Sequence, residues 1–321
     1  MSVRQRLFHA CAMGAPGAFS GKALPWSIWR DEEWPRALPQ SILITVDVEP
    51  GYLDESGERH WFRQNPEAWA GTDVGMRLLL DVLEKHHVPA TFFCCPHNHL
   101  MPDGIPWWHR IQDGRHEVGL HLHPADDRVL ADKAGFALPA NRASYYTHDQ
   151  RKSLISLAKG LLESESGLSV NALRWGNWSM DSEAAEDVLH AGISIDASSC
   201  PGLAGHMGDD RAYDWRSTAS VPHFLGATEL LEMPITTLSL YGRPLMRLDP
   251  AWGRIFLNQW PRISGHPLLH LITHSSEMCD KQGRPSRVLE CLDLWIGRAR
   301  QMQIQFDTCT HAAASWKRTN E

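Results

Sequence analysis

From residue 41 onward, short apolar runs of strand type alternate with longer segments whose apolar residues recur at helical spacing. We expect strands at 41–47, 90–95, 116–123, 172–175, 193–198, 229–235, 268–274 and 303–308. We expect helices at 74–87, 148–166, 181–192 and 284–301. Strands that alternate with helices pair in parallel, because each helix carries the chain back across the sheet. The sequence therefore predicts an α/β protein with a parallel sheet.

About seven strand–helix units follow one another, a number that fits a barrel better than two dinucleotide-binding halves. No GxGxxG sequence opens the first helix, which also argues against a dinucleotide site. Asp181 is the expected N-cap of the third helix, and Gly192 is its expected C′ residue. In barrels of parallel strands, the chemistry gathers where the strands end. The polar residues at the strand ends are therefore the candidates for a functional site.

Residues 1–40 lack this alternation and are rich in Gly, Pro and Trp. We expect an irregular N-terminal arm there, packed on one domain of residues 41–321. His9 and Cys11 interrupt the apolar residues near the start, so no signal peptide is predicted, and no run is long enough for a transmembrane segment. The seven cysteines, an odd number without a CxxC pair, indicate a reducing compartment. The expected location is the cytoplasm.

The charge of the chain limits its partners. The formal net charge is -7 and the basic residues are scattered, so no nucleic-acid partner is expected. The chain has 18 His and 14 Trp, which are unusual counts. Imidazole binds metals, and indole faces stack on sugars or cations. The use of these residues depends on where they lie along the expected strands.

Two expected strands end in pairs of polar residues spaced two apart. Asp47 and Glu49 end the first strand, and His121 and His123 end the third. Residues two apart in a strand point to the same side of the sheet, so each pair can reach one pocket. A carboxylate with two imidazoles is a common ligand set for a catalytic divalent metal, and a further carboxylate can act as a general base. The alternative is a polar turn after the first strand and two half-buried structural histidines in the third.

The other expected strands also end in polar residues. His97 and His99 follow the second strand, and we expect them at the rim of the pocket. The remaining strand-end residues are Arg174, Asp196, Glu232, His270, His274 and Asp307. Arg174 by itself is typical of a surface ion pair. A core alone would not need such residues at successive strand ends, so together they favour a metal-dependent hydrolase.

In their order along the chain, these segments resemble the polysaccharide deacetylase family, the NodB-homology domain of carbohydrate esterase 4. The resemblance runs from residue 42 to about 310 and includes most of the chain beyond the arm. The segments that carry it are TVDVEPG, PATFFCC, RHEVGLHLHP, LRWGNWSMD, GISIDASSCPG, LLEMPIT and LHLITHSSE. It implies that residues 41–321 form a catalytic domain with a distorted (β/α)₇ barrel.

The resemblance also implies an activity, which is metal-dependent removal of an acetyl group from an N-acetylated sugar or polysaccharide precursor. Asp47 would be the base that activates water, and Arg174 would orient it. His274 would protonate the departing amine. Glu49, His121 and His123 would hold one divalent metal, for which Zn²⁺ is expected. The candidate substrate contacts are Trp175, Asn177, Trp178 and His97, and further candidate sugar platforms are Trp61, Trp69, Trp107 and Trp108.

The chain departs from the family pattern in two places. The second carboxylate of the family directly follows the base, where this chain has Val48, and Glu49 then takes the ligand role. The second ligand histidine of the family lies four residues after the first, where this chain has Ala125. His123 is the natural substitute, and Asp126 or Asp127 could reach the metal instead.

Two other functions remain open from the sequence. The same barrel could hydrolyse a cyclic amide, an imide or a small amidated metabolite. It could also be a non-catalytic barrel that binds carbohydrate.

Overall fold

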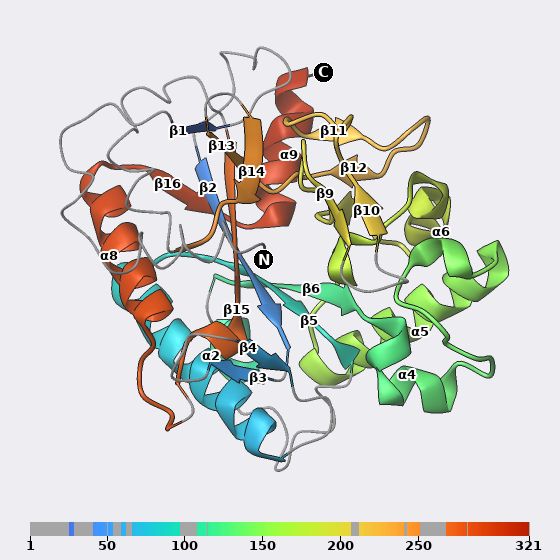
Figure 1. The fold of residues 1–321 in the computed structure, drawn as a ribbon, viewed down its shortest axis with the longest axis horizontal. Coiled ribbons are helices and arrows are strands. Elements are labelled where there is room, and N and C mark those ends of the chain that lie inside the picture. The colour runs from blue at the N-terminus through green and yellow to red at the C-terminus, as the bar shows by residue number, and fades with distance from the viewer. Residues whose placement is uncertain are drawn as a thin grey trace.

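The computed structural model describes residues 26–28, 41–49, 51–53, 59–61, 66–96, 108–113, 115–206, 212–240, 243–250, 268–280 and 282–320, and its ribbon is drawn in Figure 1. Its central sheet has nine strands in the order β11-β12-β8-β7-β6-β5-β2-β15, with β16 also paired to β2. The strands are β2 (Ser41–Val48), β5 (Thr91–Cys94), β6 (Glu117–Leu122), β7 (Ala172–Trp175), β8 (Ile195–Asp196), β11 (His223–Phe224), β12 (Leu231–Glu232), β15 (Leu268–His274) and β16 (Gln305–Asp307). All these neighbours pair in parallel except β11 with β12. The eight predicted strands are therefore present, and several of them are shorter than predicted.

Strand β2 is an interior strand of the sheet, next to its β15 edge, and is buried along its whole length. Strand β15 pairs with it from Ser41 to Asp47, and β16 and β5 share the other edge. Alternate side chains of β2 point to opposite faces of the sheet. Ile44 packs against the outer helices, whereas Leu43 lies in the barrel interior. A strand buried on both faces needs a nearly continuous apolar run, which explains the sequence SILITV.

The outer layer consists of helices on the outer face of this sheet (Figure 1). Its helices are α2 (Pro66–His86), α3 (Trp108–Asp113), α4 (Arg128–Lys133), α5 (His148–Ser166), α6 (Ala185–His190) and α8 (Arg287–Gln301). Helix α5 has the predicted bounds, because Thr147 and Gln150 form a capping box and Gly167 ends the helix at φ 68°. Helix α2 begins earlier than predicted, at Pro66.

The predicted third helix is divided into a 3₁₀ turn, Ser182–Ala184, and the short helix α6. Asp181 precedes that turn as predicted, but its carboxylate accepts the backbone N–H of Ser144 at 3.0 Å and makes no side-chain cap bond to the turn. Gly192 follows α6 with φ 73°, in the left-handed conformation predicted for a C′ residue.

Helix α9 (Cys309–Asn320) closes the end of the barrel where the strands begin. The backbone N–H of Cys309 bonds the hydroxyl of Thr91, the first residue of β5, at 3.0 Å. Its neighbour Thr310 bonds Glu117, the first residue of β6. Cys309, Ala312 and Ala313 pack with the apolar residues of the barrel interior. The strand ends that carry the candidate site therefore lie at the other end of the barrel.

The sheet curls but is not closed by strand pairing, because β12 and β15 do not pair. The chain from Thr236 to Leu248 bridges them, since the Thr236 N–H bonds the His270 carbonyl oxygen at 3.0 Å and the Ile272 N–H bonds the Leu248 carbonyl oxygen at 3.1 Å. This bridge includes the sheet of β1 (Trp26–Ile28), β13 (Thr237–Leu240) and β14 (Arg243–Arg247). The architecture is the predicted distorted barrel.

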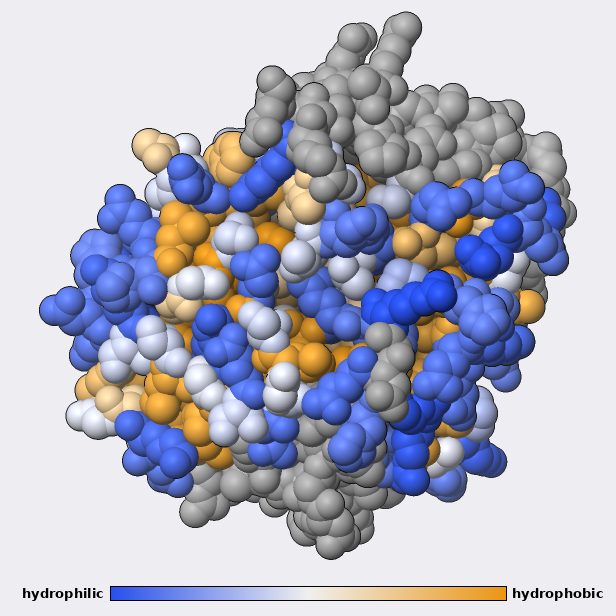
Figure 2. Space-filling view, turned by 180° about the vertical axis from the view of Figure 1, so that it is seen from behind, coloured by the Kyte–Doolittle hydropathy of each residue, from blue (hydrophilic) through white to orange (hydrophobic). Residues whose placement is uncertain are grey.

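Two small hairpins complete the described structure. They are formed by β3 (Gly51–Leu53) with β4 (Arg59–Trp61), and by β9 (Ala204–His206) with β10 (Ala212–Asp214). In the view of Figure 2, apolar residues occur in groups among polar residues over the described surface. Within the described part of the chain, no helix combines the length and the apolar character that a membrane span requires. Residues 26–28 of the predicted N-terminal arm form β1, and the domain boundary at residue 40 stays a prediction.

Candidate metal centre

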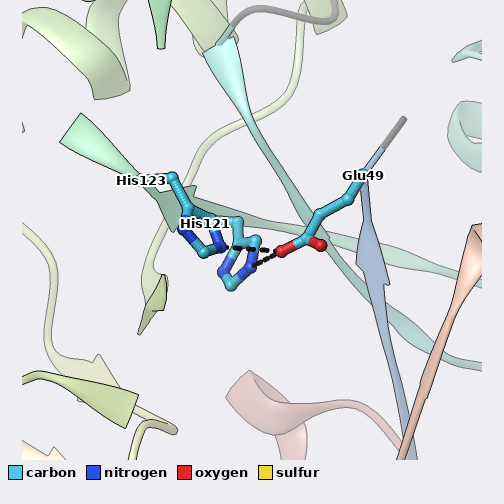
Figure 3. A group of neighbouring side chains, drawn as sticks. All are labelled: Glu49, His121 and His123. Carbon is cyan, nitrogen blue, oxygen red and sulfur yellow. Dashed lines mark hydrogen bonds and ion pairs between the residues drawn. The ribbon is translucent and has the colours of Figure 1, made fainter. Parts of the chain in front are cut away.

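Three of the predicted ligands meet where β2 and β6 end (Figure 3). The Nε2 atoms of His121 and His123 lie 2.6 Å and 2.8 Å from the same oxygen, Oε1 of Glu49. Strand β5 lies between β2 and β6 in the sheet. The long side chains at the ends of β2 and β6 therefore reach toward each other across β5. The alternation of side chains along each strand, read from the sequence, thus brings one carboxylate and two imidazoles together.

Glu49 lies just beyond the end of β2 and is held in place by a serine that follows β15. The Ser275 hydroxyl accepts the backbone N–H of Glu49 and donates to its carbonyl oxygen, both at 3.2 Å. The strand pairing of β2 with β15 ends at Asp47 opposite His274, so this hydroxyl continues the contact beyond the strands. Glu49 is buried, and Ser275 holds both its backbone N–H and its backbone carbonyl oxygen.

The two histidines differ in how they are held. His121 is buried in β6, and its Nδ1–H donates to the carbonyl oxygen of Arg174 at 2.8 Å. That bond selects the tautomer with its lone pair on Nε2, the nitrogen that faces Glu49. His123 lies one residue beyond the strand and its side chain is 14% exposed, compared with 3% for His121.

The donor set fits a divalent metal ion. One carboxylate with two imidazoles is a recognised zinc ligand set that leaves room for water and substrate. Burial would raise the pKa of Glu49, but the imidazoles of His123 and His121 outweigh it and hold that pKa well below its usual range. Glu49 is therefore an ionised carboxylate, as a metal ligand must be.

The two alternative ligands, Asp126 and Asp127, make contacts with other residues. The Asp127 carboxylate caps α4 by accepting the backbone N–H of Leu130 at 3.0 Å. The Asp126 Oδ2 atom lies 3.7 Å from Nδ1 of His123, on the side of the ring away from Glu49, and accepts the Asn141 amide at 2.8 Å. The structure groups His123, rather than either aspartate, with Glu49 and His121.

Asp47 is the second carboxylate of the site and forms an ion pair with Arg174. The Nη1 of Arg174 donates to Oδ1 of Asp47 at 2.5 Å, and both side chains are almost fully buried. Burial would raise the pKa of Asp47, but the Arg174 guanidinium, with His121 and His274, outweighs it and lowers that pKa. Asp47 is therefore held as a carboxylate beside the three candidate metal ligands.

Arg174 is itself fixed by contacts along its whole side chain. Its Nη2 donates to the Thr45 hydroxyl at 2.8 Å, and its Nε donates to the Ala197 carbonyl oxygen at 2.9 Å. The Phe93 ring lies 4.2 Å from its Cζ atom. An arginine with these partners cannot act as an ordinary surface residue. Thr45 lies two residues before Asp47, and the same alternation could have identified it in the sequence.

His274 faces Asp47 from the end of β15. Its Nε2 lies 3.7 Å from Oδ2 of Asp47, and the same oxygen lies 3.9 Å from Nε2 of His121. On its other side, Nδ1 of His274 lies 3.5 Å from Oε1 of Glu277. The Glu277 carboxylate also accepts the His274 backbone N–H at 3.1 Å and the Thr273 hydroxyl at 3.0 Å. The pattern of strand ends does not reveal this supporting role of Glu277.

His270 supports the arginine from deeper in the barrel. Its Nδ1–H donates to the Met233 carbonyl oxygen at 3.0 Å, and its Nε2 lies 2.9 Å from Nη2 of Arg174. Burial, together with the Arg174 charge, lowers the pKa of His270 to about 3. His270 is therefore a neutral imidazole that accepts a hydrogen bond from Arg174.

The other strand-end carboxylates lie away from the site. Asp196 pairs in register with Leu173 and with Glu232, and Leu173 packs in the outer core. Side chains of paired residues share a face of the sheet, so Asp196 and Glu232 point outward rather than into the barrel. Asp307 pairs in register with Leu43, near the opposite end of the barrel.

The predicted substrate contacts have different surroundings. Trp175 is completely buried and its indole N–H donates to the Asn141 carbonyl oxygen, so it packs in the core instead of offering a face to a sugar. Trp178 is 8% exposed. The Asn177 Nδ2 atom lies 3.5 Å from Nδ1 of His123. His97, His99 and Trp107, and the side chains of Trp61, Trp69 and Trp108, lie outside the described residues.

Comparisons with known proteins find similarity in structure alone. No family model matches the chain, and no curated protein matches it. A crystal structure from Mycobacterium smegmatis, described as a candidate polysaccharide deacetylase, is similar with a TM-score of 0.57 at 18% identity, over 92% of this chain and 95% of that chain.

Two further structures are similar at lower scores. A family 4 acetyl xylan esterase from Clostridium thermocellum, solved with a cobalt ion, has a TM-score of 0.45 at 13% identity, over 85% of this chain and 90% of that chain. A CE4 family pseudoenzyme from Bacillus anthracis has a TM-score of 0.46 at 15% identity, over 85% of this chain and 65% of that chain. The curled parallel sheet, together with the likeness to the Mycobacterium smegmatis structure, shows that this chain has the NodB-like polysaccharide deacetylase fold.

Proposed function

We propose that this protein removes an acetyl group from an N-acetylated sugar or polysaccharide precursor in a metal-dependent hydrolysis. One observation carries the proposal: Glu49, His121 and His123 converge directly beside an aspartate that is held ionised by a buried arginine. A structural ion pair would not need imidazoles from a second strand aimed at the neighbouring carboxylate. The fold supports the same assignment.

Glu49, His121 and His123 would hold one divalent ion, and Zn²⁺ suits this donor set. When bound, such an ion makes water more acidic and polarises a carbonyl group. The chain orients the ligands for this role through the Arg174 carbonyl oxygen, which fixes the His121 ring, and through Ser275, which fixes the main chain of Glu49.

Asp47 would accept the proton from the attacking water. A general base must be ionised before the reaction, and the Arg174 guanidinium keeps the pKa of this buried carboxyl below its usual value. The geometry also fits, because Oδ2 of Asp47 points toward Nε2 of His121 while Oδ1 is bound to Arg174. One oxygen thus stays directed at the site where water would be activated.

His274 would donate a proton to the departing amine. This step matters because an amide anion is a very poor leaving group. The Nε2 of His274 lies 3.7 Å from Oδ2 of Asp47, while Glu277 holds its backbone N–H and lies beside Nδ1.

Asp47→Asn tests the proposal, because it removes the base while keeping the size of the side chain. We expect kcat/KM for acetate release from N-acetylhexosamine compounds to fall about 10²–10⁴-fold. The matched control is Asp214→Asn, in an exposed ion pair with Arg216, which should leave the rate unchanged. Wild-type activity in the Asp47→Asn variant would overturn the role of the base.

The same substrate panel separates the other functions. Ring opening of a cyclic imide without acetate release would replace the deacetylase with an amide or imide hydrolase. A purified protein that contains no metal after zinc loading and is inactive on both substrate classes would leave only the carbohydrate-binding alternative.

A further inference from the structure

His123 occupies a position that the sheet does not fix. Strand β6 ends at Leu122, and the backbone of His123 is at φ -122° and ψ 73°. His121 is held by strand pairing to Arg174 and by its Nδ1–H bond, whereas His123 lies beyond the paired residues of β6. A ligand on irregular backbone needs other contacts to keep its ring in place.

One such contact is a tight turn that lies against the ring. A Cβ atom built on Gly176 would approach the Cε1, Nδ1 and Nε2 atoms of His123 to under 3.0 Å, so the ring packs directly on the glycine backbone. The next two residues, Asn177 and Trp178, have φ values of 55° and 59°. Left-handed conformations cost non-glycine residues about 1–3 kcal/mol each, and they cluster at functional sites. The Trp215 indole N–H holds this turn by donating to the Trp178 carbonyl oxygen at 3.1 Å.

The other contact is a carboxylate beside Nδ1. Oδ2 of Asp126 lies 3.7 Å from Nδ1 of His123. Asn141 holds that oxygen with its amide N–H at 2.8 Å, and its own Oδ1 accepts the Ala125 N–H at 3.0 Å. Asn141 is itself buried and receives the Trp175 indole N–H on its carbonyl oxygen. Asp126 is therefore held in its position by a buried residue, Asn141.

Two groups beside Nδ1 bear on the tautomer of His123. A carboxylate beside Nδ1 favours the proton on that nitrogen and leaves the lone pair on Nε2, which faces Glu49. The Asn177 amide nitrogen, 3.5 Å from Nδ1, would favour the opposite tautomer. Only the tautomer with the proton on Nδ1, beside the carboxylate, leaves Nε2 free to bind a metal next to Glu49.

We propose that Asp126 is a positioning residue for the metal ligand His123, which it orients from the Nδ1 side while the Gly176 turn provides the space for the ring. The proposal rests on the metal-dependent function proposed above. It also accounts for the second departure from the family pattern, in which the second histidine lies two residues after His121 instead of four. The Gly176 turn and Asp126 support His123 at that position.

Asp126→Asn and Asp127→Asn form a matched pair for the test. Both remove one negative charge from adjacent residues, but only Asp126 lies beside the ring, and Asn at 127 can still cap α4. Zinc affinity is measured on the full chain by competition with a chromophoric chelator. We expect Asp126→Asn to bind one zinc with about 10–100-fold lower affinity, and Asp127→Asn to bind with wild-type affinity.

Two further readouts separate positioning from a general structural role. In Asp126→Asn, kcat at saturating zinc should return to the wild-type value, because Asp47 and His274 are unchanged. Asp126→Glu, which restores the charge, should recover most of the zinc affinity.

Equal zinc affinity in Asp126→Asn and wild type would overturn the positioning role and leave the proposed function intact. A wild-type chain that binds no zinc or other divalent ion would overturn the proposed function and the positioning role together.

Discussion

At the scale of single residues, this barrel contains buried carboxyls in two opposite electrostatic states. Asp47 and Glu49 lie beside Arg174 and the imidazoles, which lower their pKa values in spite of burial. Asp196 and Glu232 face each other on the outer side of the sheet, and burial raises the pKa of both. The Ser198 hydroxyl donates to Asp196 at 2.6 Å, and the Ser199 hydroxyl donates to Glu232 at 2.7 Å. We therefore expect the second pair to hold one proton between its two carboxyls.

Glu232→Gln tests that shared proton through the pH dependence of stability. The folded-state pKa of Glu232 is raised by burial and by the charge of Asp196, so its stabilising contribution is present below its unfolded pKa and is lost as pH rises through the folded value. A glutamine cannot ionise, so the loss of unfolding free energy between about pH 5 and pH 9 should be smaller in the variant. Urea unfolding at both pH values measures it.

The control for this prediction is Glu186→Gln, at an exposed position on α6, which should keep the wild-type pH dependence. Equal pH dependence in Glu232→Gln and wild type would contradict the shared proton.

At the scale of the elements, helix α2 contacts the candidate metal site through one residue, Ser275. A Cβ atom on Gly75 of α2 would come under 3.0 Å from the backbone carbonyl oxygen of Ser275. The hydroxyl of that serine holds both backbone polar groups of Glu49. Helix α2 thus packs closely against the turn that positions Glu49, the candidate metal ligand just beyond β2.

Gly75→Ala should therefore weaken zinc binding although Gly75 touches no ligand. The added methyl group must displace the Ser275 backbone, and an overpacked core contact of this kind costs about 1–3 kcal/mol of unfolding free energy. Gly160→Ala is the control, since Gly160 lies in α5 with open space around its Cβ position and should gain about 0.5–1 kcal/mol. Chemical unfolding and zinc titration measure the two effects, and unchanged zinc affinity in Gly75→Ala would contradict this coupling.

At the scale of the whole molecule, a bound ion would join β2 and β6 across the intervening β5. Because the unfolded chain has no preformed site, binding free energy adds to folding stability. Zinc at about 100 times its Kd should stabilise the native state by about 2.7 kcal/mol, which corresponds to a Tm increase of about 5 °C. Differential scanning calorimetry with and without zinc measures it.

The same Tm increase should be smaller at about pH 5.5 than at about pH 8, because the imidazole ligands must lose their protons before they bind a metal. His121→Ala removes a ligand and should show no increase at either pH. An equal increase in that variant would assign the effect to zinc bound elsewhere on the chain.

The sequence by itself determined the strands, most of the helices and the candidate residues at the end of β2 and β6. Local patterns suffice for these features, since apolar periodicity identifies each element and residues two apart in a strand share a face. For this reason the strand pattern alone is enough to group Asp47 with Glu49 and His121 with His123.

Only the tertiary structure decided which neighbours these residues have. Asp196 and Glu232 end their strands like Asp47 does, but the register between strands turns them outward, and register depends on contacts between segments far apart in the chain. The placement of His123, rather than Asp126, beside Glu49 likewise depends on the Gly176 turn and on Asn141, which come from other segments of the chain. A sequence pattern places a side chain on a face of its own strand, whereas packing between elements determines what that side chain meets.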